Sequence, residues 1–323
     1  MGRHLPKSSI VTMTNSKRSL GQFFTVSQNP FELTAFKQWA EEANLLNKQV
    51  LEPFAGANHI IESLQATGLC NAFASYDITP AHGAVVERDT IESFPKGFNV
   101  CVTNPPWLAR NSATRRKLPY PACEYDDVYK YCLELCLKHC EFVAALIPAS
   151  FLQSGLFQER LSTYVLLHRL IFNETENPVC LALFTGSKDR PTRVFYDEEY
   201  IGDLEALRAN IPREVTNRRL RFNDPQGTLG FISFDNTRGR TIRFCSVDEI
   251  FDYEIKESSR FITRISGDFH DIPNLLAQLN SKLAKFRYET RDLFLTPFKG
   301  IREDGQYRRR MFFAQARMLI NAI

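Results

Sequence analysis

Four residues with unusual chemistry follow one another at Asn104, Pro105, Pro106 and Trp107, directly after the apolar run "FNVCVT". The prolines fix the backbone and remove two hydrogen-bond donors, so the carbonyls of Asn104 and Pro105 stay outside any strand ladder. Together with the Asn104 amide oxygen they offer acceptors to one spot beside a flat aromatic ring. An exocyclic amino group on a purine or pyrimidine fits this set, with two N–H donors and a ring that stacks on Trp107.

The same acceptors could also activate that amine. Its lone pair is conjugated into the ring, which makes it a poor nucleophile. Acceptors at Asn104 and Pro105 would draw its hydrogens toward tetrahedral geometry and free the lone pair to attack a sulfonium methyl group. The alternative interpretation is a turn that ends a strand, with Trp107 in the core.

A second constellation surrounds the stretch "LEPFAGAN", in which Glu52 ends an expected strand and Gly56 lies in a tight turn. Glycine lets a ligand approach the backbone closely, and ligands of open α/β sheets bind beyond the carboxyl ends of the strands. Asp77 ends the next expected strand, where an acid could accept from ribose hydroxyls, and Asp89 could accept from an exocyclic amine. The full G-x-G-x-x-G pattern is absent because Asn58 stands in place of a second glycine. An ordinary strand-to-helix turn is the alternative.

The elements expected around these residues alternate between strand and helix. Hydrophobic periodicity predicts helices at 32–46, 59–68 and 126–140, strands at 49–54, 71–78, 98–103 and 141–148, a weaker element ending near 95, and a final strand pair at 166–174 and 179–186. Such alternation predicts an α/β fold with a mostly parallel sheet.

The chain is expected to divide near residue 200. We predict a flexible basic arm at 1–17, an α/β domain at 18–200 and a region of short polar segments at 201–323. Residues 207–323 hold 21 Lys and Arg against 14 Asp and Glu, whereas residues 1–206 hold 19 against 23. A basic C-terminal half favours an anionic partner such as nucleic acid, although a solvated basic surface is the alternative.

Three arginine-rich clusters in that region also contain aromatic residues, a mixture typical of nucleic-acid contacts. They are "TNRRLRF" at 216–222, "NTRGRTIRF" at 236–244 and "YRRRMFF" at 307–313. Each could instead be a solvated strand edge.

Composition excludes several classes of protein. The chain has 323 residues, of which 44% are hydrophobic and 24% are charged. No apolar run reaches the roughly 18 residues of a membrane span, and the N-terminus has no apolar signal region. Eight cysteines without CxxC pairing favour a reduced, cytoplasmic setting. Cys132, Cys136 and Cys140 fall on one helical stripe, which favours a buried face over a metal site, and we expect no metal.

The ordered set "LGQFFT" (20–25), "LEPFAGAN", "YDIT", "RDT" and "NPPW" resembles the amino-methylating, N6-adenine DNA methyltransferases. Specifically, it is similar to type I and type II modification enzymes in which cofactor motifs precede the catalytic motif and a C-terminal target-recognition region follows. The resemblance covers about 18–190 and departs from the family at Asn58.

This resemblance implies a class I, Rossmann-like methyltransferase fold with S-adenosylmethionine as its cofactor. It implies cofactor contacts from Phe24, Thr25, Glu52, Ala55, Gly56, Asp77 and Asp89, with Glu52 orienting the turn. The implied enzyme is a site-specific, adenine-specific DNA methyltransferase of restriction-modification type, which methylates N6 of an adenine flipped out of double-stranded DNA. A restriction nuclease or a specificity subunit is a possible partner. Phe172 is a candidate for the second wall of the base pocket, or an ordinary core residue.

Alternatives from other classes stay open at this stage. The same tetrapeptide could serve methylation of an RNA base or of a protein glutamine. A non-catalytic DNA-binding partner could also keep the fold, although the intact set of Gly56, Asp77 and 104–107 argues against lost chemistry.

Overall fold

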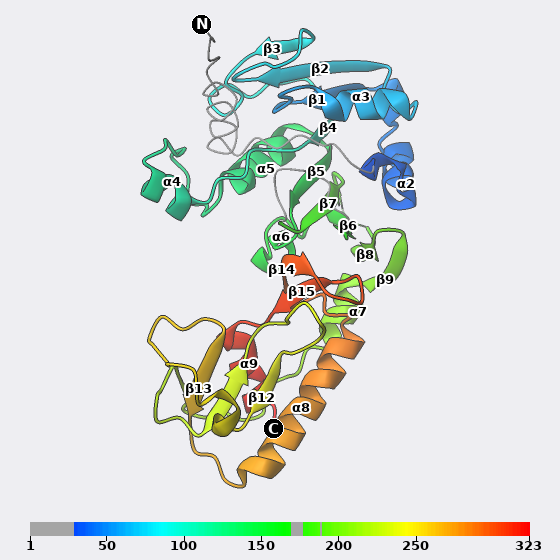
Figure 1. The fold of residues 1–323 in the computed structure, drawn as a ribbon. Helices are drawn as coiled ribbons and strands as arrows, with labels where there is room; N and C mark the ends of the chain where they lie inside the picture. Colours follow the sequence, from blue (N-terminus) through cyan, green and yellow to red (C-terminus); the bar gives the residue numbers. More distant parts are fainter. Residues whose placement is uncertain (1–28, 169–176, 188) are drawn as a thin grey trace, which may run out of the picture. The chain divides into compact units, whose positions relative to one another are not determined.

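The computed structural model describes residues 29–168, 177–187 and 189–323 (Figure 1). Its contacts divide the chain into two compact units. Unit 1 comprises the described residues up to Phe151 together with Gly155–Tyr200, and unit 2 comprises Leu152–Ser154 together with Ile201–Ile323. The main crossing therefore lies between Tyr200 and Ile201.

Unit 1 is built around a nine-stranded sheet in the order β3-β2-β1-β4-β5-β7-β6-β8-β9, whose last strand continues past Tyr200 into the residues of unit 2. The strands are β1 (Gln49–Glu52), β2 (Ala72–Asp77), β3 (Val85–Glu87), β4 (Val100–Thr103), β5 (Phe142–Pro148), β6 (Leu161–Leu167), β7 (Val179–Phe184), β8 (Arg193–Tyr196) and β9 (Glu199–Asp203). The first five strands pair in parallel, and β7 runs antiparallel to both β5 and β6. This topology confirms the predicted Rossmann-like α/β fold.

The register brings the carboxyl ends of three strands to one edge of the sheet. Leu51 of β1 pairs with Ala74 of β2 on one side and with Cys101 of β4 on the other. Strand order reverses between β1 and β4, because β2 and β3 lie on one side and β5 lies on the other. Such a switch point opens a crevice at the strand ends, so the residues that follow β1, β2 and β4 can meet there.

Helical segments precede or connect these strands, and the last of them, α6, lies mostly within the residues of unit 2. They are η1 (Pro30–Glu32), α2 (Thr34–Glu42), η2 (Leu45–Asn47), α3 (His59–Ala66), α4 (Arg110–Arg116), α5 (Val128–His139) and α6 (Phe151–Ser154). Helix α5 packs against β5 and buries Cys132 and Cys136, while Cys140 is buried just beyond its end. None of the described helices has the length and apolar character needed to cross a bilayer.

The final strand pair differs from the prediction. Its first strand is β6, formed by "LSTYVLL", and it does not start at Leu166. The β-branched and aromatic residues of this segment suit a strand that is buried along most of its length. The rest of the predicted strand lies in 169–176, outside the described residues. The sequence also gave no indication that β8 and β9 extend the sheet.

Unit 2 carries a four-stranded antiparallel sheet in the order β10-β13-β11-β12 and a separate hairpin of β14 and β15. Its elements are α7 (Leu204–Ala209), β10 (Arg221–Phe222), β11 (Leu229–Ile232), β12 (Arg243–Cys245), η3 (Val247–Ile250), β13 (Ile262–Ser266), α8 (Ile272–Glu289), β14 (Thr296–Ile301), β15 (Tyr307–Arg310) and α9 (Phe313–Asn321). The 18-residue helix α8 packs against β12 and α9.

The expectation of short polar segments after residue 200 is therefore wrong. Unit 2 has its own core, in which Phe231 and Phe244 of the sheet meet Leu279 and Phe286 of α8. Its apolar residues are separated by many charged ones, so the sequence did not predict a long buried helix or strand there. Helix α8 nevertheless buries Leu275, Leu279, Leu283 and Phe286 at helical spacing.

A buried ion-pair network holds three segments of unit 2 together. The Arg287 guanidinium donates to Asp235 at 2.7 and 2.9 Å and to Asp292 at 2.7 and 2.9 Å. Arg302 of the hairpin loop donates to the same Asp235 carboxylate at 2.7 Å. Although burial opposes it, hydrogen bonds and charge from Arg287, joined by Arg302, hold the pKa of Asp235 below its usual range. Arg287 and Arg302 contribute to the basic excess of residues 207–323, but both are buried and do not belong to a basic surface.

Candidate active site

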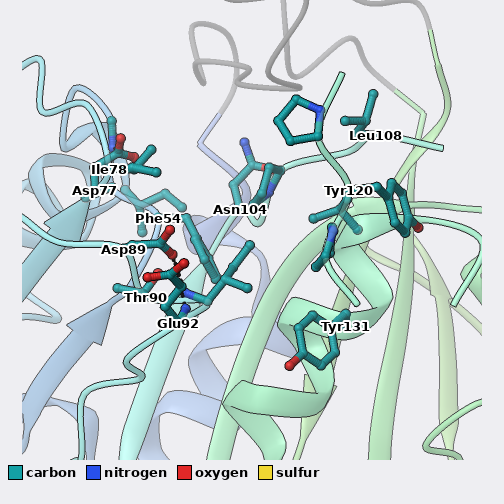
Figure 2. Close-up of a pocket in the computed structure, with 18 of the residues that line it drawn as sticks. Phe54, Asp77, Ile78, Asp89, Thr90, Glu92, Asn104, Leu108, Tyr120 and Tyr131 are labelled. Atoms are coloured by element: carbon teal, nitrogen blue, oxygen red, sulfur yellow. Dashed lines mark hydrogen bonds between the residues drawn. The ribbon is translucent and has the colours of Figure 1, made fainter. Parts of the chain in front are cut away.

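A cavity of about 640 Å³ lies in unit 1 at the carboxyl ends of β1, β2 and β4. Six of the predicted site residues line it: Ala55, Gly56, Asp77, Asp89, Asn104 and Pro106. In Figure 2, Asp77 and Asp89 lie on one side of the cavity, with Asn104 beyond them toward the other side. The structure thus brings both predicted constellations to a single hollow.

The turn after β1 is joined to the end of β2 through Asp77. Gly56, with φ of +51°, donates its N–H to Asp77 Oδ2 at 2.8 Å, and Thr79 donates its N–H to Oδ1 at 2.8 Å. Burial raises the pKa of Asp77 above its usual value, and these two backbone donors oppose the shift. A carboxylate pinned in this way keeps a fixed orientation toward the cavity that it lines.

Asn58, the departure from the G-x-G-x-x-G pattern, occupies a position that favours glycine. Its φ of +66° is left-handed, a conformation that asparagine tolerates better than most residues. Its Oδ1 accepts a hydrogen bond of 2.6 Å from the Ser75 hydroxyl in β2. The side chain therefore ties the turn to the neighbouring strand, which a glycine could not do.

Asp89 lies in a turn that its own side chain stabilises. Its Oδ1 accepts from the backbone N–H groups of Ile91 at 3.0 Å and Glu92 at 3.2 Å. The Thr90 hydroxyl donates to the Pro53 carbonyl at 2.8 Å and fastens this turn to the end of β1. Asp89 is thus held at the cavity wall by short local bonds.

Glu52 does not line the cavity, because it is fully buried beneath the turn. Its Oε1 accepts from the Thr103 hydroxyl at 2.8 Å and from the Phe54 N–H at 3.3 Å. Burial raises the pKa of Glu52 to about 8, against the opposing effect of these donors. Glu52 therefore links the turn after β1 to the residue that precedes Asn104, and it holds a proton at neutral pH.

Within the tetrapeptide, Asn104 and Pro106 face the cavity, whereas Pro105 and Trp107 do not line it. Trp107 is only 8% exposed, so its ring packs into the protein behind the segment. The sequence pattern placed all four residues in one group and could not distinguish the faces that they present.

The opposite wall of the cavity was missed from the sequence. It contains Leu108, Tyr120 and Tyr131, and Figure 2 shows both tyrosines on the α5 side. Asp127, the N-cap of α5, accepts from the Leu108 N–H at 3.0 Å. The signal that could have revealed this wall is the Pro-Tyr-Pro stretch around Tyr120, because prolines fix an aromatic ring in a loop.

Arg110 folds the loop that carries this wall. Its guanidinium lies 4.5 Å from the centroid of the Tyr120 ring and donates to the carbonyls of Cys123 and Tyr125. Tyr120 donates its hydroxyl to the same Tyr125 carbonyl at 3.0 Å. The loop is therefore held by one arginine with no carboxylate in these contacts.

Three predicted residues, Phe24, Thr25 and Phe172, lie outside the described residues. Within the part of the chain that the structure describes, no group of three or more His, Cys, Asp or Glu residues is arranged to hold a metal ion. Burial, and then hydrogen bonding with the thiols of Cys136 and Cys140, raise the pKa of Cys101 in β4.

The sequence matches no protein-family model, and no curated protein matches it. Its fold resembles several solved structures. A proposed class I S-adenosylmethionine-dependent methyltransferase from Listeria monocytogenes is 11% identical, with a TM-score of 0.35 over 53% of this chain and 68% of that one. The methyltransferase subunit of a type I restriction-modification system from Streptococcus thermophilus is 13% identical, with a TM-score of 0.38 over 57% of this chain and 50% of that one.

The M protein of the type I restriction enzyme EcoKI is 14% identical, with a TM-score of 0.37 over 88% of this chain and 74% of that one. This chain spans only half of the Streptococcus subunit. At these identities and scores, neither activity nor substrate carries over to this chain by similarity.

Proposed function

We propose that this protein transfers a methyl group from S-adenosylmethionine to the N6 amino group of an adenine in DNA. The observation that carries the proposal is the shared cavity of Asn104, the Gly56 turn and the two acids Asp77 and Asp89. A methyl donor and an amine acceptor must meet in one site, and this hollow combines groups suited to each.

The residues of the cavity fit the proposed cofactor. Its volume of about 640 Å³ lies within the range of about 300–1,000 Å³ that is usual for cofactor sites. Ala55 and Gly56 would contact the methionine part, Asp77 the ribose hydroxyls and Asp89 the adenine amine. When bound, S-adenosylmethionine supplies an electrophilic methyl group.

Asn104 would act on the acceptor side of the reaction. Its amide oxygen would accept a hydrogen bond from the target amine and turn the nitrogen lone pair out of conjugation. The Pro105 carbonyl would join it as a second acceptor only if it turned toward the cavity, which Pro105 does not line. In a duplex this amine is hidden, so the base must be flipped at a cost of a few kcal/mol. Stacking of the base on Trp107 would need that ring to come out of the protein, whereas Pro106 already faces the cavity.

DNA is the proposed substrate because basic residues exceed acidic ones in the C-terminal part of the chain, which forms unit 2. Residues 207–323 hold 21 Lys and Arg against 14 Asp and Glu, and such an excess favours phosphate contacts. A methyltransferase that acts on a protein glutamine would not require it. Double-stranded DNA is therefore the proposed partner, with a restriction nuclease or specificity subunit as a further proposed one.

The decisive test replaces Asn104. Asn104→Ala should abolish methyl transfer from labelled S-adenosylmethionine to DNA, while calorimetry shows nearly unchanged cofactor affinity, because the lost acceptor serves the target amine. Asn111→Ala, at an exposed position of helix α4, is the matched control and should behave like wild type. Sequencing sensitive to N6-methyladenine identifies the product, and methylation by Asn104→Ala near the wild-type rate would refute the assignment.

A further inference from the structure

Strand β15 in unit 2 presents two arginines on one side and buries the residues that alternate with them. Tyr307 and Arg309 are 1% and 2% exposed, whereas Arg308 and Arg310 are partly exposed. This alternation is the normal period of a strand. The arginine cluster predicted at 307–313 therefore divides into a buried half and a surface half.

Each surface arginine lies against two phenylalanine rings. The Arg308 guanidinium is 4.5 Å from the centroid of Phe298 and 5.6 Å from that of Phe234. The Arg310 guanidinium is 5.0 Å from the ring centroids of both Phe261 and Phe312. We call this set the arginine–phenylalanine face: Phe234, Phe261, Phe298, Arg308, Arg310 and Phe312.

The face is continuous although its residues come from separate segments. Phe298 of β14 pairs with Arg308, and an isolated bridge joins Phe234 to Arg310. The Phe261 ring lies 5.3 Å from Phe234 and 6.1 Å from Phe298. Four segments thus converge on one array of rings, which a solvated strand edge would not require.

Two of these rings are open to solvent. Phe261 is 42% exposed and Phe312 is 44% exposed. Exposing large apolar rings costs free energy, and grouped aromatic residues at a surface commonly mark a binding site.

The charges of the face are not neutralised within the described residues. Arg308 and Arg310 form no ion pair with any described carboxylate, in contrast to buried Arg287 and Arg302. Arg310 donates to the Arg260 carbonyl at 3.2 Å, and its Nε has no partner among the described residues. Burial, and then the charge of neighbouring Arg260, lower the pKa of Arg310 from its usual value. An anion at this face would relieve that repulsion.

We propose that the arginine–phenylalanine face binds a nucleic-acid strand, with phosphates at Arg308, Arg310 and Arg260 and unstacked bases on Phe261 and Phe312. Nucleic acid combines regularly spaced anions with flat rings, which is the combination that this face offers. An acidic peptide would satisfy the guanidinium groups and leave the rings exposed. The proposal rests on the nucleic-acid substrate of the proposed function and adds the surface that contacts it.

The experiment measures binding of fluorescein-labelled single- and double-stranded oligonucleotides to the full chain by anisotropy. Replacing both Phe261 and Phe312 by Ala should weaken binding at least about tenfold, since stacking contributes about 1–3 kcal/mol per base. Arg310→Ala should also lower the slope of log affinity against log salt by about 0.9, the value for one lost phosphate contact.

Two matched controls come from the same unit. Phe251 is 71% exposed and lies outside the face, and Arg213 is exposed outside the arginine clusters. Phe251→Ala and Arg213→Ala should keep wild-type affinity, and melting curves should show that every variant is folded. Equal losses in controls and face variants would overturn the proposal, because they would mean that general charge or hydrophobicity drives binding.

The outcomes separate this proposal from the proposed function. Face variants that bind DNA like wild type, while Asn104→Ala alone stops methylation, would refute the face and leave the function intact. Loss of DNA binding in the face variants of a protein that methylates no DNA would support the face and refute the function. Displacement of DNA by polyglutamate at equal charge concentration would identify the face as a site for acidic protein and overturn its assignment to nucleic acid.

Discussion

Two carboxyl groups with no solvent exposure, Glu52 in unit 1 and Asp235 in unit 2, are treated in opposite ways. Asp235 receives hydrogen bonds from two arginines, which hold its pKa below the usual range. Glu52 accepts hydrogen bonds from the Thr103 hydroxyl and the Phe54 N–H, and burial raises its pKa to about 8. One group is charged when buried, and the other is kept neutral.

The difference follows from the partners that each carboxyl group has. Breaking a buried charge pair leaves an uncompensated charge behind, so the Asp235 network fixes the segments that it joins. Strongly shifted carboxyls are commoner at functional sites than elsewhere, and Glu52 joins Phe54, before the Gly56 turn, to Thr103, before Asn104. The partners of a buried acid therefore decide whether it is charged or neutral.

The largest expected effect is a loss of stability in unit 2 when the Asp235 ion-pair network is broken. Asp235→Asn leaves Arg287 and Arg302 buried with too few negative charges, so unit 2 should lose about 3–5 kcal/mol of stability. Urea unfolding followed by far-UV circular dichroism measures this loss. Both tryptophans, Trp39 and Trp107, belong to unit 1, so the fluorescence transition should change less. Asp248→Asn, at an exposed site, is the control, and equal stability of the two variants would contradict the network.

The intermediate effect concerns pH and Glu52. Because the folded pKa is raised from 4.5 to about 8, the native state holds a proton that the unfolded chain releases. Stability from this group is full below pH 4.5 and falls as pH rises toward 8, by up to about 1.4 kcal/mol per pH unit. Asp235, whose pKa is lowered, acts in the opposite sense, and its contribution is lost as pH falls through the acid range.

Unfolding of unit 1 should therefore be followed by tryptophan fluorescence between pH 6.5 and 8. This window lies above the raised pKa of Asp127, which burial brings to about 6. Wild type should lose stability across the window, and Glu52→Gln should flatten the curve. A slope that persists in Glu52→Gln would assign it to another group.

The smallest effect compares two left-handed asparagines, one in each unit. Asn58 has φ of +66° and accepts from Ser75, while Asn223 has φ of +57° and donates to the carbonyls of Glu257 and Ser259. Alanine at either position loses these bonds and strains the backbone, at about 1–2 kcal/mol. Glycine should recover part of the loss at both sites. Only Asn58→Ala should also weaken cofactor binding in calorimetry, and an equal weakening by Asn223→Ala would refute the link.

The sequence predicted what local pattern controls. Strands β1, β2, β4 and β5 and helices α3 and α5 form near the expected positions, because each joins a short apolar run to a clear stop such as Gly68 or Asn104. Parallel pairing then brings the strand ends together, which is why Gly56, Asp77 and Asn104 share a cavity.

What it could not predict depends on packing across the chain. Trp107 and Arg309 are 8% and 2% exposed, and this burial depends on residues that lie far away in the sequence. The tyrosine wall depends on Arg110, which folds a loop more than ten residues away. Such choices follow from tertiary contacts that no local window contains.

Cysteine burial has a practical consequence for following ligands in solution. Seven of the eight free thiols are buried, and Cys123 alone is partly accessible. Cys123 belongs to the loop held by Arg110, next to Ala122 at the cavity wall. A thiol-reactive fluorophore should therefore attach at one place in the native protein, with no engineered residue, and its emission would report each molecule that enters the cavity beside it.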